Sequence, residues 1–375
     1  MKPQEVLIFH NILWSHYTGV VFGHLSAELC KHKGSLFVVH VADSMESRKG
    51  IGEVDNRYHQ YPYKVLFPGA IEQAGKWKQL LAGIKIFTAS KATDVMVFGY
   101  DLPIYVLAII LSPLLGKRLH IVADATAYDR ARQPWKEKLK ALLLRRAATV
   151  ICYGQAHRQY LMSLGVPATK IAIRLQATDN EQVRQLYQQW QQAQAPALPP
   201  AQRSFIFIGR LIEEKNLFTL LQAFAQLKSN WVLKIVGSGV QEPLLKAYCE
   251  THAIQNVQFM GALALADAVT VLAASDVLVL PSVSETWGLV VNEAMLCEKP
   301  VIVSHHCGCA LELVQHGHNG YIINPNDVDD LAAAMQKFVS GEADVKAMGA
   351  ASLAIVKDFT PEKAASQIFA AISEN

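Results

Sequence analysis

The sequence predicts two α/β domains, each built on a parallel sheet with helices on both faces. Short, continuous apolar runs alternate with helical stretches along the chain. A stretch rich in Gln, Ala and Pro at 188–203 divides these runs into two sets. That composition is typical of a linker and not of a packed helix or strand. The length of 375 residues also suits two domains of about 150 residues each.

The apolar runs predict the strands in chain order. The first set lies at 6–9, 36–41, 95–98, 120–123, 149–152 and 171–173, and the second at 205–208, 232–236, 257–259, 277–280, 301–303 and 321–323. Largely apolar strands are typical of parallel sheets covered on both faces. We therefore expect a doubly wound sheet in each domain, with ligands at the carboxyl ends of the strands and the active site between the domains.

The domain boundaries follow from the same pattern. We place an N-terminal domain at 1–190, a linker at 191–203 and a C-terminal domain at 204–358. Residues 1–200 carry 24 Lys and Arg against 14 Asp and Glu, whereas residues 201–375 carry 11 against 18. The net charge of +3 thus conceals a basic and an acidic half, which indicates a different partner for each.

Composition excludes several classes of protein. With 51% hydrophobic and 18% charged residues, the chain is neither disordered nor of low complexity. The apolar stretch 102–115 is shorter than the roughly 20 residues that a bilayer span needs, so we expect a buried helix there. The first residues read as a strand rather than a signal peptide, and six irregularly spaced cysteines suit reduced thiols, so we expect a cytoplasmic protein.

A metal site is one alternative near the end of the chain, where Cys307 and Cys309 follow His305 and His306. Structural zinc sites usually need two separated pairs of ligands, and the sequence has no second cysteine pair. We expect activity that does not depend on a metal. The acidic run most similar to an Asp-x-Asp metal-binding motif, 327–330, falls in a predicted C-terminal loop.

A cationic motif follows the first strand of the C-terminal domain. Gly209 allows a sharp turn, Arg210 comes next, and Lys215 lies near the start of the following helix. Two cations beside a helix N-terminus favour binding of a diphosphate, although both can also be solvated surface charges. Further along, Gly237 and Gly239 form a Gly-x-Gly after a strand, which indicates either a nucleotide contact or only a tight turn.

The strongest motif lies at 278–304. Glu285 is in a polar loop after a strand, Gly288 opens the next helix, and Glu293 follows Glu285 after seven intervening residues. Backbone N–H groups of Gly288 and Leu289 are placed to hold phosphate oxygens, and a carboxylate deeper in the helix can accept hydrogen bonds from ribose.

An ordinary capped helix is the alternative for this motif. Ser284 or Thr286 would then cap the helix, and Glu293 would lie on a solvated face. The apolar neighbours of Glu293 argue against this, because a glutamate in a buried segment usually has a partner.

These motifs, in the order G-R-x4-K, G-x-G and E-x7-E, resemble the GT-B glycosyltransferases of family 4 type over roughly 205–335. The resemblance implies two Rossmann-like domains facing across a cleft, and a retaining enzyme that uses a nucleotide-sugar donor. It implies that Arg210 and Lys215 contact the donor diphosphate, that Glu293 binds the ribose and that Glu285 lies at the donor sugar. The other implied donor contacts are Gly209, Gly237, Gly261, Thr286, Gly288 and Leu289. A last helix, in 359–375, would cross back onto the N-terminal domain.

The N-terminal half resembles this family only loosely. Gly19 opens a helix and is a further implied donor contact, although the family often has two adjacent glycines where this chain has Thr18 and Gly19. His16, in the same loop, is either a sugar contact or polar surface. Asp124 stands where the family commonly has a histidine, and it would bind a sugar hydroxyl, accept a proton from the acceptor, or merely cap a loop.

The segment 130–147 holds seven Lys and Arg and one acidic residue, Glu137. Apolar residues recur at helical spacing between the cations, namely Trp135, Leu139, Leu142 and Leu143. This pattern is typical of a helix on an anionic membrane surface, and also of a domain helix with its leucines in the core. Nucleic-acid binding is not expected, because no known nucleic-acid-binding motif accompanies these basic residues.

The sequence therefore predicts a glycosyltransferase that moves a sugar from a UDP- or GDP-sugar to a hydroxyl of a glycan or lipid-linked glycan. We expect a role in bacterial cell-surface polysaccharide synthesis, peripheral on the inner face of the plasma membrane. Retention of configuration is implied by the resemblance alone, and no cofactor or metal is expected. Two alternatives are a catalytically silent nucleotide-sugar-binding or scaffold subunit on the same fold, and a sugar-nucleotide epimerase.

Overall fold

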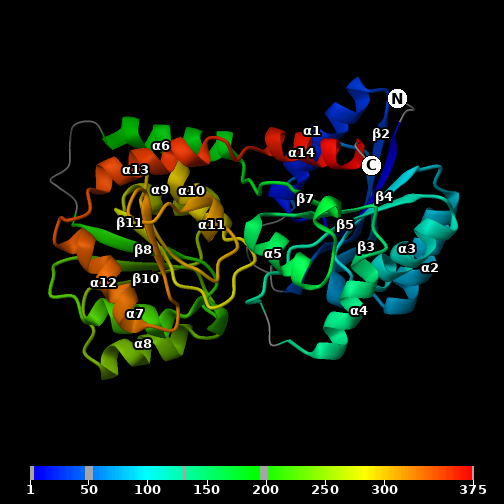
Figure 1. The fold of residues 1–375 in the computed structure, drawn as a ribbon. Coiled ribbons are helices and arrows are strands. Elements are labelled where there is room, and N and C mark those ends of the chain that lie inside the picture. Colours follow the sequence, from blue (N-terminus) through cyan, green and yellow to red (C-terminus); the bar gives the residue numbers. More distant parts are fainter. Residues whose placement is uncertain (1–3, 47–53, 130–131, 195–201, 374–375) are drawn as a thin grey trace. The chain divides into compact units, whose positions relative to one another are not determined.

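The computed structural model describes residues 4–46, 54–129, 132–194 and 202–373 (Figure 1). The chain forms two compact units. Unit 1 contains the described residues up to Ala125, those from 132 to Ala177, and those from Thr360 onward, and unit 2 contains 126–129 and Thr178–Phe359. Arg130 of the basic segment and residues 195–201 of the predicted linker lie outside the described residues.

Within its described residues, unit 1 is built on a seven-stranded parallel sheet in the order β3-β2-β1-β4-β5-β6-β7. The strands are β1 (Glu5–Ile12), β2 (Ser35–Ser44), β3 (Tyr63–Ala70), β4 (Asp94–Phe98), β5 (Arg118–Val122), β6 (Thr149–Cys152) and β7 (Ile171–Ile173). The sequence did not predict β3, because this edge strand is mostly half-buried or exposed and lacks a continuous apolar run. The strand order reverses between β1 and β4, which is where such sheets bind ligands.

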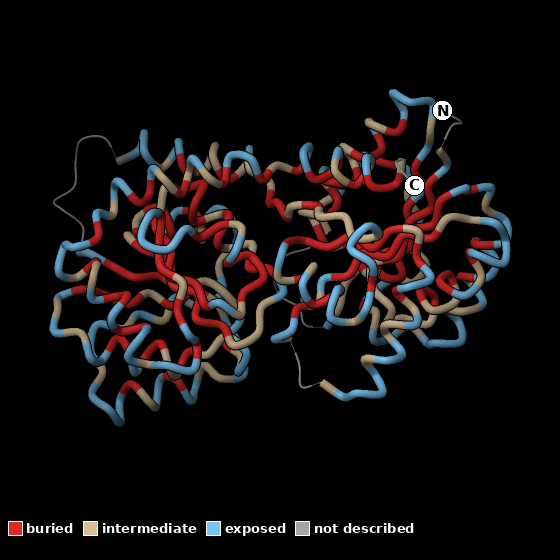
Figure 2. The backbone as a smooth tube through the Cα atoms, in the orientation of Figure 1, coloured by how far each residue is buried: buried red, intermediate tan, exposed pale blue. Residues whose placement is uncertain are grey.

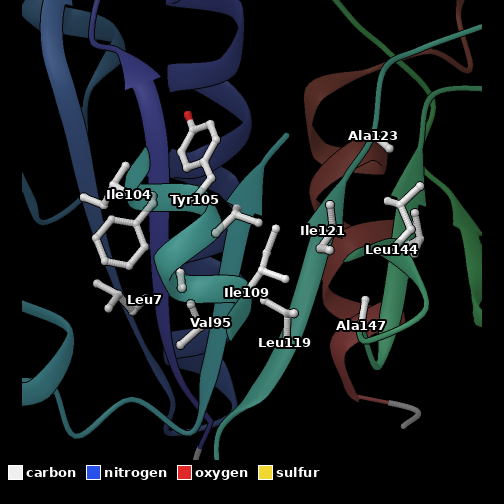
Figure 3. Packing of buried hydrophobic residues seen from close by; sticks show 14 of the residues in the cluster. Leu7, Val95, Ile104, Tyr105, Ile109, Leu119, Ile121, Ala123, Leu144 and Ala147 are labelled. Atoms are coloured by element: carbon white, nitrogen blue, oxygen red, sulfur yellow. The ribbon is translucent and has the colours of Figure 1, made fainter. Parts of the chain in front are cut away.

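Helices cover both faces of this sheet. One face carries α2 (Lys76–Ala89), α3 (Pro103–Leu114), α4 (Pro134–Leu144) and α5 (Gln155–Ser163), which all contribute to one apolar core with the strands. Figure 3 shows Ile109 of α3 beside Val95 and Leu119 of the sheet, and Ile104 belongs to the same core. On the other side, α1 (His16–Lys31) packs against α14 (Pro361–Ser373).

The apolar stretch 102–115 was predicted to be a buried helix, and this is wrong for its last turn. Ile104 and Ile109 of α3 are fully buried, but Leu114 and Leu115 are 74% and 51% exposed. Across the part of the chain that the structure describes, no helix has both the length and the apolar character to cross a bilayer.

Unit 2 is built on a six-stranded parallel sheet, again within the described residues, in the order β10-β9-β8-β11-β12-β13. The strands are β8 (Ser204–Ile208), β9 (Val232–Val236), β10 (Val257–Gly261), β11 (Val277–Leu280), β12 (Val301–Ser304) and β13 (Gly320–Ile323). The helices are α6 (Asn180–Gln194), α7 (Leu217–Ala225), α8 (Glu242–Thr251), α9 (Leu265–Ala273), α10 (Leu289–Leu296), α11 (Ala310–Leu313), α12 (Val328–Val339) and α13 (Val345–Val356). Contacts join α7 with α8 and α12, and α10 with α6, α9 and α13, so helices flank this sheet on both sides (Figure 1).

The chain passes between the units at places other than the predicted linker. Unit 2 begins at Thr178, so α6 belongs to it, although we had placed residues up to 190 in the N-terminal domain. The physical reason is that α6 packs on α9 and α10 and buries Val183 and Tyr187. The chain returns to unit 1 at Thr360. Figure 2 shows that most strands of both sheets are buried along most of their lengths, whereas the edge strands β3, β7 and β10 are not.

Candidate active site

The candidate site of unit 2 lies where the order of its sheet reverses, between the neighbouring strands β8 and β11. Gly209 and Arg210 follow the carboxyl end of β8, and the loop 281–288 follows that of β11. Open α/β sheets bind ligands at such a reversal. Motifs that are far apart in the sequence therefore meet at one edge of the sheet.

Lys215 and Glu285 form an ion pair at this edge. Lys215 ends the 3-10 helix η5 (Glu213–Lys215), and Glu285 lies in the loop after β11. Their side chains are only 13% and 17% exposed, so water screens the pair less than it screens a surface pair. The sequence had suggested separate ligands for the two residues. In the structure, a diphosphate at Lys215 must share its ammonium with the Glu285 carboxylate or displace that carboxylate.

Hydrogen bonds to neighbouring segments fix the loop that carries Glu285. The N–H of Gly308 donates to the carbonyl oxygen of Glu285 at 2.9 Å. Trp287 is 2% exposed and donates its Nε1–H to Oδ1 of the buried Asn292 at 2.9 Å. We did not predict roles for Trp287 and Asn292, because nothing in their spacing reveals a hydrogen bond between a loop and the following helix.

Gly288 is the N-cap of α10, one residue before the helix begins at Leu289. Its φ of 98° lies in the left-handed region, and a Cβ there would lie 2.9 Å from Cδ2 of Leu280. Glycine is therefore required for the turn. The first N–H groups of a helix have no partner within it and, with the helix dipole, favour an anion. Thr286 beside this turn is exposed.

Glu293 lies on the second turn of α10 and is half-buried. Removal of water by the surrounding protein raises the pKa of its carboxyl to about 7, and a hydrogen bond donated by Oγ1 of Thr178 to Oε1 at 3.5 Å opposes this rise in part. A carboxyl with such a pKa is not an ordinary solvated group. Near neutral pH it can change protonation state when a ligand binds.

The glycines after β9 allow close contact with the turn after β8. A Cβ on Gly237 would overlap the carbonyl oxygen of Gly209, and a Cβ on Gly239 would overlap that of Leu211. The N–H of Gly237 also donates to the carbonyl oxygen of Gly261 at 2.7 Å. These contacts give Gly237 and Gly239 a structural role, while the nucleotide contact of Gly209, Gly237 and Gly261 stays a prediction.

Two further residues lie in the segment after β8, before and after Lys215 in the sequence. Arg210 is exposed at the end of β8. Asn216, with a left-handed φ of 58°, donates from Nδ2 to the carbonyl oxygens of Pro281 at 3.2 Å and Pro325 at 2.7 Å. It therefore ties the turn after β8 to the ends of β11 and β13. We did not predict this role, because an Asn before a helix indicates only a cap.

In unit 1, His16 is the first residue of α1. Its ring makes stacked contacts with those of Trp14 and Tyr58, with centroids 5.2 Å and 4.9 Å away, and its Nε2 accepts the N–H of Asp55 at 3.2 Å. These contacts hold the imidazole in a fixed orientation. Its role as a sugar contact stays a prediction.

Gly19 does not open α1 as predicted, because the helix already begins at His16. Its N–H donates to the carbonyl oxygen of Ser15 at 2.9 Å and so is not available to a phosphate. A Cβ on Gly19 would lie 2.7 Å from the carbonyl oxygen of Tyr58, so close packing accounts for this glycine. Asp124 follows β5 and is exposed, and its role stays a prediction.

Among the described residues, no group of three or more His, Cys, Asp or Glu is placed to hold a metal ion. Cys307 and Cys309 are buried, and burial raises the pKa of both thiols. The acidic run contains one Asp-x-Asp spacing, at Asp327 and Asp329, which our expectation of metal independence did not take into account. The prediction that this run lies in a loop is wrong, because Asp327 caps α12 by accepting the N–H groups of Asp329 and Asp330, which lie in the first turn of the helix. Metal independence stays a prediction.

Comparison with known proteins identifies the C-terminal part of the chain. Residues 188–353 match the family model of the glycosyl transferases group 1. The putative colanic acid biosynthesis glycosyltransferase WcaL of Salmonella typhimurium is 29% identical over 206 residues, which are 52% of this chain and 48% of that protein. The D-inositol 3-phosphate glycosyltransferase of Rhodococcus jostii is 30% identical over 179 residues, which are 45% of this chain and 39% of that protein. The chain thus spans less than half the length of these curated relatives.

Solved structures resemble the whole chain. Anabaena Alr3699/HepE in complex with UDP and glucose has a TM-score of 0.75 at 21% identity, over 99% of this chain and 100% of that one. Sucrose-phosphate synthase from Thermosynechococcus elongatus has a TM-score of 0.77 at 18% identity, over 99% of this chain and 98% of that one. The fold is that of the GT-B glycosyltransferases, as the sequence predicted. Within it, residues 188–353 form a glycosyl transferases group 1 domain.

Proposed function

We propose that the chain transfers a hexose from a UDP- or GDP-sugar to a hydroxyl of a glycan or lipid-linked glycan, with retention and without a bound metal. The observation that carries this proposal is the ion pair of Lys215 with Glu285, three residues before the N-cap of α10, at the reversal point of the sheet in a domain that matches group 1. A structural neighbour was solved with UDP and glucose, and a relative in Corynebacterium glutamicum is named as GDP-mannose-dependent, so both bases belong in the test.

The chemistry follows from the charges. The acceptor hydroxyl oxygen bonds to the sugar C1 as the bond from C1 to the diphosphate oxygen breaks, and the hydroxyl proton passes to the departing diphosphate. Until that proton arrives, negative charge develops on the β-phosphate. Arg210, Lys215 and the first N–H groups of α10 stabilise that charge, and each preorganised donor contributes about 3 kcal/mol. Glu285, released from Lys215 by the diphosphate, accepts a hydrogen bond from a donor-sugar hydroxyl. Glu293 accepts hydrogen bonds from the ribose.

A membrane location for this reaction is supported by α4. Trp135, Leu139 and Leu142 are 63%, 50% and 57% exposed, so these three do not lie in the core as the alternative required. Leu143, the fourth apolar residue of the predicted stripe, does pack against the core. On the opposite side of the helix, Glu137 pairs with Lys140 at 2.7 Å. An outward apolar stripe flanked by cations fits the inner face of an anionic plasma membrane, where a lipid-linked acceptor for cell-surface polysaccharide would lie.

The test is a panel of UDP- and GDP-sugars, first for thermal stabilisation and then for transfer to acceptor extracts, with the anomeric product read by NMR. One donor is expected to raise Tm and to give a product with retained anomeric configuration. Treatment with a chelator is not expected to abolish the transfer. Stabilisation without turnover would instead indicate a silent binding subunit. A change of sugar configuration without release of the nucleotide would indicate an epimerase.

A further inference from the structure

A second apolar and basic surface lies on unit 1, outside the segment 130–147. On α2, three side chains are exposed at 79%, 68% and 40%, namely Trp77, Leu81 and Ile84. Their spacing of i, i+4 and i+7 places them on one stripe of the helix. The opposite side of α2 buries Gln79, Gly83 and Phe87. The stripe therefore faces away from the core of unit 1.

The neighbouring helix α3 also exposes apolar side chains, at its end. Helices α2 and α3 pack on each other, and Gly83 permits a close approach because a Cβ there would lie 2.6 Å from Cγ1 of Ile104. At the end of α3, three more aliphatic side chains are exposed, namely Ile110, Leu114 and Leu115. We call the exposed apolar side chains of the two helices the α2–α3 surface: Trp77, Leu81, Ile84, Ile110, Leu114 and Leu115.

Within the helices α2 and α3 all charged side chains have one sign. Helix α2 contains Lys76, Lys78 and Lys85, all exposed, and no acidic residue, and α3 contains no charged residue. On α4, Trp135, Leu139 and Leu142 repeat the same i, i+4, i+7 spacing. Because α2, α3 and α4 cover one face of the same sheet, both apolar stripes belong to one side of unit 1 (Figure 1).

We infer that the α2–α3 surface docks on an anionic lipid bilayer, so that membrane contact extends beyond α4. Exposed Trp and aliphatic side chains enter the interface between headgroups and acyl chains, while flanking lysines bind anionic headgroups. A second copy of this chain is a poorer occupant, since it would bring the lysines of two α2 helices together. The biological purpose of this docking rests on the proposed lipid-linked acceptor. The exposed apolar and basic residues that would bind the bilayer do not depend on the proposed reaction.

The test is flotation of the full chain with vesicles of phosphatidylglycerol and phosphatidylcholine, compared with vesicles of phosphatidylcholine alone. Wild type is expected to float with the anionic vesicles, and less so as salt rises. Trp77→Gln/Leu81→Gln and Leu114→Gln/Leu115→Gln are each expected to weaken binding roughly tenfold, because they remove apolar area that enters the interface. The matched control is Leu244→Gln on α8 of unit 2, where Leu244 is 61% exposed. It is expected to bind like wild type.

Two results would overturn this inference. The first is that both α2–α3 variants float as well as wild type and only Trp135→Gln/Leu139→Gln loses flotation. That result would restrict docking to α4. The second is concentration-dependent self-association in sedimentation that the α2–α3 variants abolish, which would make the surface a self-interface. Donor hydrolysis measured without vesicles separates this inference from the proposed function: a chain that floats yet never turns over a donor contradicts only the latter.

Discussion

The ammonium group of Lys215 pairs with the carboxylate of Glu285, across 70 residues of sequence. The strands that precede the two residues, β8 and β11, are neighbours at the reversal point of the unit 2 sheet. Neither side chain is more than 17% exposed, so removal of one partner leaves the other charge poorly solvated. The pair holds a cation in place at the sheet edge before a donor binds.

Removal of either predicted diphosphate contact is expected to slow transfer. Arg210→Ala and Lys215→Ala should each lower kcat/KM by about 100-fold, which corresponds to about 3 kcal/mol of transition-state stabilisation. Lys246→Ala serves as the control, because Lys246 is exposed on α8 and pairs with Glu242. Steady-state kinetics with the donor found in the panel provide the measurement, and wild-type turnover by either variant would reject the diphosphate assignment.

Glu293 is expected to make stability fall as pH rises. Its pKa is raised to about 7, above the usual value of a glutamate, so the folded protein holds this proton more tightly than the unfolded chain does. The resulting stabilisation is complete below about pH 4 and disappears as pH rises through 7. Glu293→Gln should therefore be more stable than wild type at pH 8, on the order of 2 kcal/mol, and similar to it at pH 4. Urea unfolding at the two pH values decides this.

The same residue predicts a pH dependence of donor binding. If the ribose hydroxyls donate to the Glu293 carboxylate, donor affinity should fall as pH decreases from 8 to 6. Glu293→Gln should bind the donor more weakly and lose most of this pH dependence. Calorimetric titration of the nucleoside diphosphate at several pH values measures both effects, and an unchanged pH profile in the variant would exclude Glu293 as the titrating group.

Three buried histidines in unit 1 are expected to make the protein sensitive to acid. Burial lowers the pKa of His10 to about 3, of His40 to about 2 and of His59 to about 4. Below pH 6.5 the unfolded chain binds protons that the folded protein does not, so stability falls by up to about 1.4 kcal/mol per histidine and pH unit. Tyr61 joins the cluster, since its hydroxyl lies 3.1 Å from Nε2 of His40 and 2.7 Å from Nδ1 of His59.

The variant that tests this cluster is His40→Gln, whose stability should depend less steeply on pH between 7 and 5. His252→Gln is the matched control, because His252 is exposed on the surface of unit 2. Urea midpoints across this range provide the slopes. Equal slopes for wild type and His40→Gln would show that His40 does not contribute to acid sensitivity.

Gly237→Ala is expected to destabilise unit 2 more than an ordinary left-handed glycine would. Its φ is 134°, and the added Cβ would overlap the backbone of Gly209. Gly317→Ala is the control, since Gly317 has a φ of 78° but open space around it, and it should lose only about 1 kcal/mol. Gly237→Ala should lose at least about twice as much. Equal Tm values for the two variants would contradict the close contact.

Much of the fold could be predicted from local patterns. The run at 205–208 and its counterparts became neighbouring strands, because continuous apolar segments between helices must pair side by side to satisfy their backbone groups. The edge strand β3 was missed because it is only partly buried. The domain boundary was misplaced because the Gln-rich stretch begins only inside α6, whereas the chain enters unit 2 already at Thr178 and α6 buries Val183 and Tyr187 there.

The sequence by itself determined the two α/β units and the residue types at the site, since strand periodicity and motif spacing are properties of short segments. Only the tertiary structure decided that Lys215 meets Glu285, that Glu293 is desolvated, and that Trp77 and Trp135 point outward. Each of these depends on which distant segments the sheet brings together and which faces it covers. Such long-range contacts set charge, protonation and exposure, and no local pattern encodes them.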